Sequence, residues 1–280
     1  MCEFCTKHGE GEKWYLQAKN YSADFNSDLK RRKFAIDFFR KTTEKAPRDL
    51  KRLEWLSSFP RIIQDMVKGL VTWKQKKEHF GQVVPLEDVE KILSMVNTVV
   101  AFPCLCRKVT IKKEVRCCFG LSISPAVDSV ISSILSDSYL NGPEVQGIEK
   151  VDKETALKMM KEFETDGLAH SVWTILTPFI AGICNCDRSD CLAMKVTVSH
   201  DLKVMFRAEY IAGIDWEQCT GCRECMGLCQ FGALSYSYSL GKVAIDLSKC
   251  YGCGVCRAGC TKGAIFLKPR NNHPQVAQVW

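Results

Sequence analysis

Two cysteine runs with the same spacing lie near the end of the chain and constrain its fold more than any other feature. The first contains Cys219, Cys222, Cys225 and Cys229, and the second contains Cys250, Cys253, Cys256 and Cys260. Three thiolates spaced three residues apart can bind one [4Fe-4S] cubane, while the fourth thiolate points to the neighbouring cluster. The spacing therefore predicts one cluster held by Cys219, Cys222, Cys225 and Cys260, and another held by Cys250, Cys253, Cys256 and Cys229.

The two runs belong to a longer internal repeat. A shift of 31 residues also superimposes Asp215 on Asp246, Gly221 on Gly252, Gly232 on Gly263 and Ala233 on Ala264. This repeat indicates the duplication of one cluster-binding unit. A backbone that wraps closely around a cluster needs positive φ angles, which explains the repeated glycines. Their N–H groups can then face the cluster sulfurs and help to set the reduction potential.

Residues 208–266 resemble a bacterial dicluster ferredoxin module. The resemblance implies a first strand at residues 210–215 and a hairpin formed by residues 233–239 and 242–246. Alternating residue character in the two hairpin segments, with Leu240-Gly241 between them, supports this interpretation.

One position departs from the ferredoxin pattern in both copies. The proline that usually follows the fourth cysteine is Gln230 in the first run and Thr261 in the second. Each of these positions keeps a backbone N–H that proline would lack. Zinc sites rarely use two interlocked runs of four cysteines, and disulfides do not suit a reducing compartment. We therefore interpret both runs as iron–sulfur ligands.

Composition and hydropathy predict a globular, soluble protein. The chain has 280 residues, of which 46% are hydrophobic, enough for one large or two modest domains. The first residues lack the apolar core of a signal peptide. The apolar stretch at residues 172–184 is too short to span a bilayer and contains Pro178. We expect a cytoplasmic protein, in which 17 cysteines point to metal ligation.

The first 80 residues are basic and have a helical pattern. They carry 18 Lys and Arg against 11 Asp and Glu, whereas the other 200 residues carry 21 of each. Helical spacing predicts a segment capped by Ser27 that runs through Arg40, with Pro47 and Pro60 opening two further helices. A basic patch can attract an acidic partner or phosphates, and solvated helix faces explain the same charges equally well.

Two further helices are expected before the ferredoxin-like module. One extends from Pro85 to about Val99, and the other is capped by Asp152 and ends at Gly167. The predicted fold class is α+β, with a mostly helical, cysteine-rich N-terminal domain followed by a small dicluster ferredoxin domain. We divide the chain into a basic helical region at 1–82, a cysteine-rich α+β domain at 83–205, the ferredoxin-type domain at 206–268 and a tail at 269–280.

Nine cysteines precede the repeat, namely Cys2, Cys5, Cys104, Cys106, Cys117, Cys118, Cys184, Cys186 and Cys191. Exposed thiols oxidise, so such clustering favours metal binding. In a C-x-C pair both thiolates can reach one cluster, or one metal can take a pair from each of two hairpins. The alternatives are one additional [4Fe-4S] cluster, two additional clusters, or a zinc site with spare cysteines.

One additional cluster is the favoured interpretation. Its expected core ligands are Cys104, Cys106, Cys184 and Cys186, with Cys117 or Cys191 as substitutes. Cys2 and Cys5 would complete a second site if the N-terminus folds back. Any single cysteine, such as Cys118 or Cys191, can also be interpreted as a buried structural residue.

A second resemblance covers roughly residues 83–268. It rests on the segments Phe102-Pro-Cys-Leu-Cys-Arg107, Cys117-Cys-Phe-Gly120, the helix before Gly167-Leu-Ala-His170, and Gly182-Ile-Cys-Asn-Cys186, in that order. Together with the C-terminal module they resemble a family of 4Fe-4S proteins from anaerobes, in which a cysteine-rich α+β domain precedes a dicluster ferredoxin. Members of that family often carry paired cysteines near the Cys-Asn-Cys segment, where this chain has Asp187 and Asp190.

Three functions follow from these patterns. The leading hypothesis is single-electron transfer within an anaerobic redox complex, with a flavoprotein or another iron–sulfur oxidoreductase subunit as partner. The second is a catalytic reductase subunit, in which an upstream cluster with an open iron site binds substrate. The third, ranked last, is a redox-sensing nucleic-acid-binding regulator that uses the basic first 80 residues. Arg107 and Arg188, beside cysteines, could raise a cluster's potential, bind an anion or simply cover a helix face.

Overall fold

A seven-stranded sheet forms the centre of the upstream part of the molecule. The structure is a computed structural model that describes residues 2–21, 28–124, 134–135 and 137–280. Within these residues the strand order is β4-β2-β3-β6-β5-β1-β7. The strands are β1 (Gly81–Val83), β2 (Thr98–Phe102), β3 (Cys118–Ser122), β4 (Glu149–Val151), β5 (Ala169–Thr174), β6 (Ile180–Cys186) and β7 (Met205–Phe206). Neighbouring strands are antiparallel, except that β1 and β7 are parallel.

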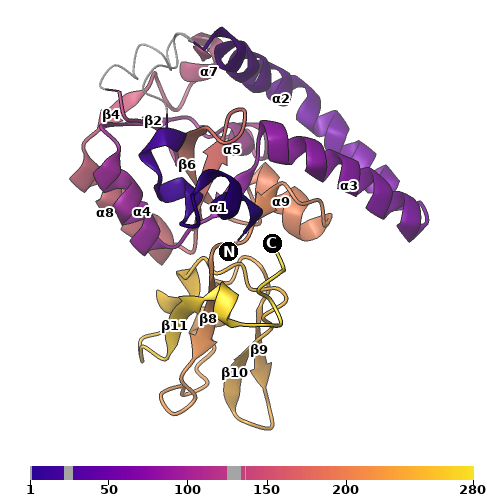
Figure 1. Ribbon diagram of the computed structural model, residues 1–280, viewed down its shortest axis with the longest axis vertical. Helices are drawn as coiled ribbons and strands as arrows, with labels where there is room; N and C mark the ends of the chain where they lie inside the picture. Colours follow the sequence, from indigo (N-terminus) through magenta and orange to yellow (C-terminus); the bar gives the residue numbers. More distant parts are fainter. Residues whose placement is uncertain (1, 22–27, 125–133, 136) are drawn as a thin grey trace.

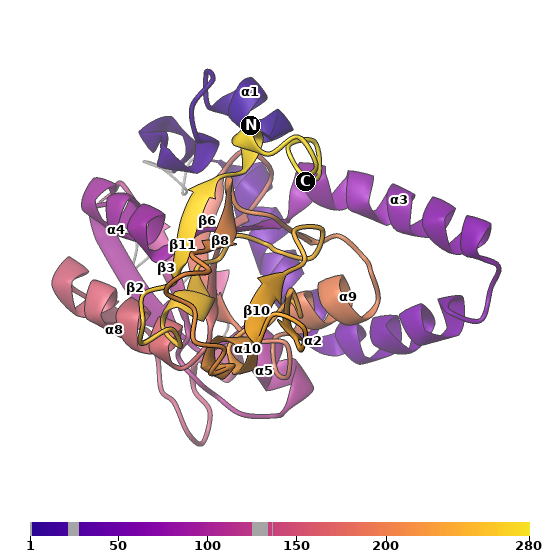
Figure 2. The same cartoon turned by 90° about the horizontal axis from the view of Figure 1, so that it is seen from below.

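One face of this sheet is covered by two amphipathic helices and the N-terminal segment. The helices are α4 (Leu86–Met95) and α8 (Lys153–Thr165), which lie side by side (Figures 1 and 2). As predicted, Asp152 caps α8, because its carboxylate accepts the Thr155 N–H at 2.9 Å. The N-terminal segment adds α1 (Glu3–His8) and two 3-10 turns, Trp14–Leu16 and Ala18–Asn20. Their apolar side chains share one core with those of α4 and α8.

The opposite face carries shorter helices and most of the upstream cysteines. Helices α5 (Leu105–Thr110) and α9 (Leu192–Ser199) contact each other, and α5 also contacts the long helix α2 (Leu29–Leu56). Helix α7 (Asp137–Leu140) lies near the start of α2 (Figure 1). The α+β class is therefore confirmed. The upstream part was expected to be mostly helical, and its seven-stranded sheet is larger than that prediction implied.

The break predicted at Pro47 is wrong, because α2 continues through this residue. Proline has a φ angle compatible with a helix, but it removes one donor, here the N–H that would face the Thr43 carbonyl, and its ring crowds that carbonyl. Ala46 is buried, and Phe38 and Phe39 pack against the same apolar cluster, so tertiary contacts hold the helix before Pro47. After Pro47, Leu56 is buried at the end of the helix. Ser27, the predicted cap, lies outside the described residues, and the Asp28 carboxylate accepts the Arg31 N–H at 2.9 Å.

Helix α3 (Arg61–Glu78) follows Pro60 as predicted, but no residue in it is buried. Its apolar stripe faces outward, and the side chains of Ile62, Met66 and Leu70 are 82%, 64% and 65% exposed. Figure 2 shows the α2–α3 pair extending away from the sheet. In the part of the chain that the structure describes, no helix is both long and apolar enough to cross a membrane.

Helix α4 ends earlier than predicted, at Met95 rather than near Val99. Val96 already has an extended backbone, and the Asn97 N–H donates to the Ser122 carbonyl at 2.8 Å. The following run of β-branched residues suits a strand better than a helix, and β2 begins at Thr98.

The ferredoxin-like part contains two small antiparallel pairs. Strand β8 (Tyr210–Ile214) pairs with β11 (Ile265–Pro269), and β9 (Leu234–Ser237) pairs with β10 (Lys242–Ile245). The first strand and the hairpin are thus found where the sequence predicts them. Gly241 in the turn has a φ of 64°, a conformation that favours glycine. The short helix α10 (Glu224–Gly227) and a 3-10 turn at Val255–Arg257 connect the cysteines.

The C-terminal tail folds back onto the upstream part. After a 3-10 turn at Arg270–Asn272, Val276 is buried and Trp280 stacks on Phe206 with ring centroids 4.3 Å apart. Trp280 also contacts Phe4 of the N-terminal segment at 4.9 Å between ring centroids. Trp280 therefore joins the two ends of the chain in one packed region (Figure 1), whereas Val276 packs in the core of the ferredoxin-like part.

Two methionines provide a matched test of which helix faces support the fold. Met160 of α8 is fully buried, whereas Met66 of α3 is 64% exposed. We expect Met160→Ala to lower the free energy of unfolding by about 2–5 kcal/mol, because it leaves a cavity in the core. Met66→Ala should change it by less than about 0.5 kcal/mol. Anaerobic denaturant unfolding followed by circular dichroism measures both, and equal losses would contradict the assigned core.

Candidate iron–sulfur centres

Four cysteines of the repeat line one cavity in the ferredoxin-like part. They are Cys219, Cys222, Cys225 and Cys260, the same four that the spacing groups together. Apolar residues such as Val243 and Ile265 form much of the remaining lining, together with the cationic residues Arg223 and Lys262. Gly221 in this loop has a φ of 72°, and a Cβ atom there would lie 2.1 Å from the Gly241 carbonyl oxygen. Only glycine therefore allows the loop to close against the β9–β10 turn.

The second group consists of Cys250, Cys253 and Cys256 with Cys229 from the first run. Burial raises the pKa of each of the other three thiols, and Cys229 lies close enough for its charge to raise each pKa further, as the predicted grouping requires. Gly252 repeats the role of Gly221, with a φ of 69° and only 2.0 Å between a hypothetical Cβ and the Tyr210 carbonyl oxygen. The duplication in the sequence is thus repeated in the backbone geometry.

Burial disfavours the thiolate form of these cysteines when no cation is bound. It raises the pKa of Cys225 to about 11 and the pKa of Cys253 to about 12. At neutral pH such groups stay protonated unless a metal displaces the proton. Backbone N–H groups are also aimed at sulfur, since Ala233 donates to Cys229 and Ala264 to Cys260, each at 3.2 Å. Donors of this kind stabilise thiolate ligands and tune a cluster's potential.

The upstream cysteines between residues 104 and 191 gather on one face of the sheet. The sulfurs of Cys104, Cys117 and Cys118 lie within 4.8 Å of one another, and all three residues are buried. Cys184 of β6 lies opposite Cys118 of β3, because these two residues are paired on neighbouring strands. Cys104 also interacts with Cys106, which in turn interacts with Cys191.

The closest group of sulfurs differs in membership from the predicted core of Cys104, Cys106, Cys184 and Cys186. The adjacent pair Cys117 and Cys118, treated in the sequence as a substitute and a structural cysteine, lies at the centre of the group. Cys186 lies farther along β6, where its thiol interacts with that of Cys191. The strand register, which no local spacing reveals, brings the adjacent pair next to Cys104.

Arg107 is directed at the upstream cysteines, whereas Arg188 is exposed. The Arg107 guanidinium donates to the Cys117 sulfur, to the Asn185 carbonyl oxygen at 3.2 Å and to the Asp187 carboxylate. Asp187 lies where the resembling family often has a cysteine. Here its carboxylate holds the Arg107 guanidinium in place. A fixed positive charge in contact with a sulfur favours the more negative state of any cluster bound there.

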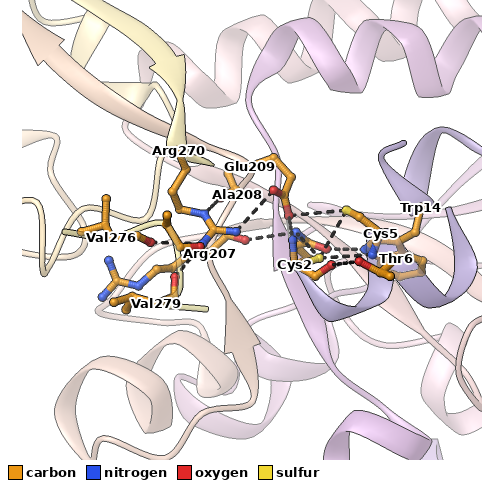
Figure 3. Close-up of polar contacts among 12 residues, drawn as sticks. Cys2, Cys5, Thr6, Trp14, Arg207, Ala208, Glu209, Arg270, Val276 and Val279 are labelled. Atoms are coloured by element: carbon orange, nitrogen blue, oxygen red, sulfur yellow. Dashed lines mark hydrogen bonds and ion pairs between the residues drawn. The ribbon is translucent and has the colours of Figure 1, made fainter. Parts of the chain in front are cut away.

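Cys2 and Cys5 lie apart from the other upstream cysteines. The N-terminus does fold back, but these two thiols belong to the core on the opposite face of the sheet. Figure 3 shows them beside Glu209, which the sequence analysis did not single out. A lone glutamate between two strands gives no local signal, because only the folded chain brings residues 2, 5 and 209 together.

Gln230, where the ferredoxin pattern has proline, connects the two parts of the molecule. Its side-chain amide donates to the Gly167 carbonyl oxygen at 2.8 Å, and its carbonyl oxygen accepts the Arg188 N–H at 2.9 Å. Arg257 makes a second connection, as its guanidinium pairs with Glu87 of α4 and lies 3.8 Å from Glu164 of α8. These contacts attach the ferredoxin-like part to the sheet and its helices.

The comparison with protein families agrees with the geometry of the C-terminal part. Residues 218–265 match the family model described as a 4Fe-4S dicluster domain, and this range includes all eight cysteines of the two runs. The fold and the matched segment therefore define an iron–sulfur, ferredoxin-like domain near the C-terminus. No curated protein matches the chain.

The contact made by Gln230 predicts a local effect of its removal. In Gln230→Ala the Arg188 N–H loses its acceptor, so we expect its hydrogen exchange to become about fivefold faster, the factor for a hydrogen bond of about 1 kcal/mol. Thr261, the exposed equivalent residue in the second run, provides the control Thr261→Ala. Hydrogen-exchange mass spectrometry should show unchanged exchange at Arg188 in that variant. Equal rates in both variants would contradict the connection.

Proposed function

We propose that the protein transfers single electrons through two C-terminal [4Fe-4S] clusters and at least one further cluster in the upstream part. Cys219, Cys222, Cys225 and Cys260 would hold one C-terminal cluster, and Cys250, Cys253, Cys256 and Cys229 the other. The observation that carries this proposal is the cavity lined by four thiols from both runs, within a segment that matches a dicluster domain. Such clusters exchange one electron each and need no acid or base.

The upstream cluster would be centred on Cys104, Cys117 and Cys118. Three buried sulfurs within 4.8 Å of one another supply three of the four ligands that a cubane requires. Cys184, opposite Cys118 in the sheet, and Cys106, in contact with Cys104, are the candidates for the fourth ligand. The pair Cys186 and Cys191 remains beside this group.

A continuous apolar core supports electron passage between the two regions. Cys186 and Cys191 share a buried cluster with Cys253 of the second C-terminal group, and Val83 and Phe231 pack in the same cluster. Electron tunnelling weakens steeply with distance, so packing the two regions against each other favours transfer between them. We therefore propose a fixed sequence of clusters rather than a freely moving carrier domain.

Helix α3 supports docking of a redox partner. Its outward apolar stripe includes Met66, Leu70 and Trp73, each at least 60% exposed, and Lys76 and Lys77 lie in its last turn. Contiguous exposed apolar surface often marks an interface. We propose that the protein is an electron-transfer subunit of a redox complex, with a flavoprotein or another iron–sulfur subunit as partner.

Iron analysis of anaerobically prepared protein tests the number of clusters. Three [4Fe-4S] clusters correspond to about 12 irons and 12 sulfides per chain, and two correspond to about eight of each. We expect about 12 in the unmodified protein and about eight in Cys118→Ser. The dithionite-reduced protein should give cluster electron paramagnetic resonance signals. About eight irons in the unmodified protein would rule out the upstream cluster, and no cluster signal under any condition would rule out electron transfer.

The charge of Arg107 should raise the potential of the upstream cluster. In Arg107→Gln we expect the midpoint potential of that cluster to fall by roughly 60 mV, which is one tenfold change for a one-electron couple. Arg188→Gln removes an exposed arginine and should shift the same potential far less. A redox titration followed by electron paramagnetic resonance measures both variants. An equal shift in the two variants would show that the contact with Cys117 has no special effect.

A further inference from the structure

We infer that Cys2, Cys5 and Glu209 form a mononuclear site for a divalent metal of the zinc type, separate from the iron–sulfur groups. The two sulfurs are 3.3 Å apart, and the Cys5 sulfur lies 3.5 Å from the Glu209 Oε1 atom (Figure 3). All three ligand atoms lie within 4.8 Å of one another. This spacing needs only small adjustments to surround one metal ion with bonds of about 2.0–2.3 Å.

The site is deeply buried, which argues against thiol exchange with a partner. Cys2, Cys5 and Glu209 are 3%, 0% and 5% exposed. Thiol–disulfide exchange requires a thiolate that another sulfur can reach. A buried group of two thiols and a carboxylate is stable as a set of anions only with a cation among them.

Neighbouring backbone groups are arranged as metal-bound thiolates require. The Cys5 N–H donates to the Cys2 sulfur at 3.4 Å, and the backbone N–H of Trp14 donates to the Cys5 sulfur. The Cys2 N–H donates to Glu209 Oε1 at 3.1 Å. Hydrogen bonds of this kind orient ligands and stabilise their charged forms.

Arg270 supplies the charge balance and fixes the carboxylate. Its guanidinium is 1% exposed and donates to Glu209 Oε2 at 3.3 Å and to the Ala208 carbonyl oxygen at 3.0 Å. Oε2 is thus occupied, and Oε1 is left to face the two sulfurs. Two thiolates and one carboxylate carry three negative charges, which a divalent cation and one arginine neutralise completely.

The donor set favours zinc among common divalent ions. Thiolates select soft or borderline metals, whereas Mg²⁺ and Ca²⁺ prefer all-oxygen sites. Two thiolates and a carboxylate leave one tetrahedral position, which water or a small external donor would take. Because Cys2 and Cys5 belong to the N-terminal segment and Glu209 leads into β8, the metal would join that segment to the start of the ferredoxin-like part.

Zinc K-edge X-ray absorption of the full-length, anaerobically prepared protein tests this site. The absorption at this edge comes from zinc alone, so iron clusters do not contribute to the spectrum. After expression in zinc-supplemented medium we expect about one zinc per chain, with two sulfurs at about 2.3 Å and oxygen ligands at about 2.0–2.2 Å. Absence of zinc, a shell of four sulfurs, or a Cys2–Cys5 disulfide in the alkylated protein would overturn the proposal.

Two variants separate this site from the iron–sulfur groups. Cys5→Ser should lose the zinc and keep its iron, whereas Cys118→Ser should lose iron and keep the zinc. Glu209→Gln should keep both sulfurs as zinc ligands and bind zinc more weakly in a competition with a chelator. Loss of iron with retained zinc in Cys5→Ser would overturn the assignment. The spectrum of the unmodified protein decides the matter even if a variant fails to fold.

Discussion

Buried sulfur is the constraint on which the rest of this structure depends. All 17 cysteines are free, and all but Cys222 are buried or partly buried. Thiolates in such surroundings need a metal, so the fold has to bring the right sulfurs together before any of them can ionise. It does so in two ways. The C-terminal part uses loop geometry with glycines at positive φ, and the upstream part uses strand register, which sets Cys118 opposite Cys184.

A second constraint is the attachment of the ferredoxin-like part to the sheet. The Arg207 guanidinium donates to the Cys250 carbonyl oxygen at 2.7 Å, and the Ala208 N–H donates to the Tyr251 carbonyl oxygen at 2.9 Å. The second cysteine loop is therefore bonded directly to the segment that leaves β7. With the contacts of Gln230, these bonds make the ferredoxin-like part a fixed element of the molecule.

The C-terminal groups could be predicted because their determinants are local. Spacing and duplication were enough to group Cys219, Cys222 and Cys225 with Cys260, and the four line one cavity. The upstream sheet could not be predicted in the same way, since its strands are short and pair across long stretches of sequence. The role of Pro47 was misjudged for a related reason, because the packing of the helix outweighs the cost of a proline inside it. Glu209 had no signal at all before folding.

The two cysteine regions differ in the groups that contact their sulfurs, and under the proposed function this difference adjusts the potential of each cluster. The C-terminal sulfurs accept hydrogen bonds from neutral backbone groups, such as the N–H of Ala233 and Ala264. The upstream sulfurs have the Arg107 guanidinium in contact with Cys117. Asp187 takes up part of that charge, but the cation is the group that touches sulfur. Because a cation stabilises the reduced cluster more than a neutral dipole does, Arg107 would raise the potential of the upstream cluster. Arg223 and Lys262, which line the cavity of the first C-terminal group, would act in the same direction on the cluster there. Electrons would then pass between the two regions through the shared core of Cys253 and Cys186, and the balance of these charges would set the direction.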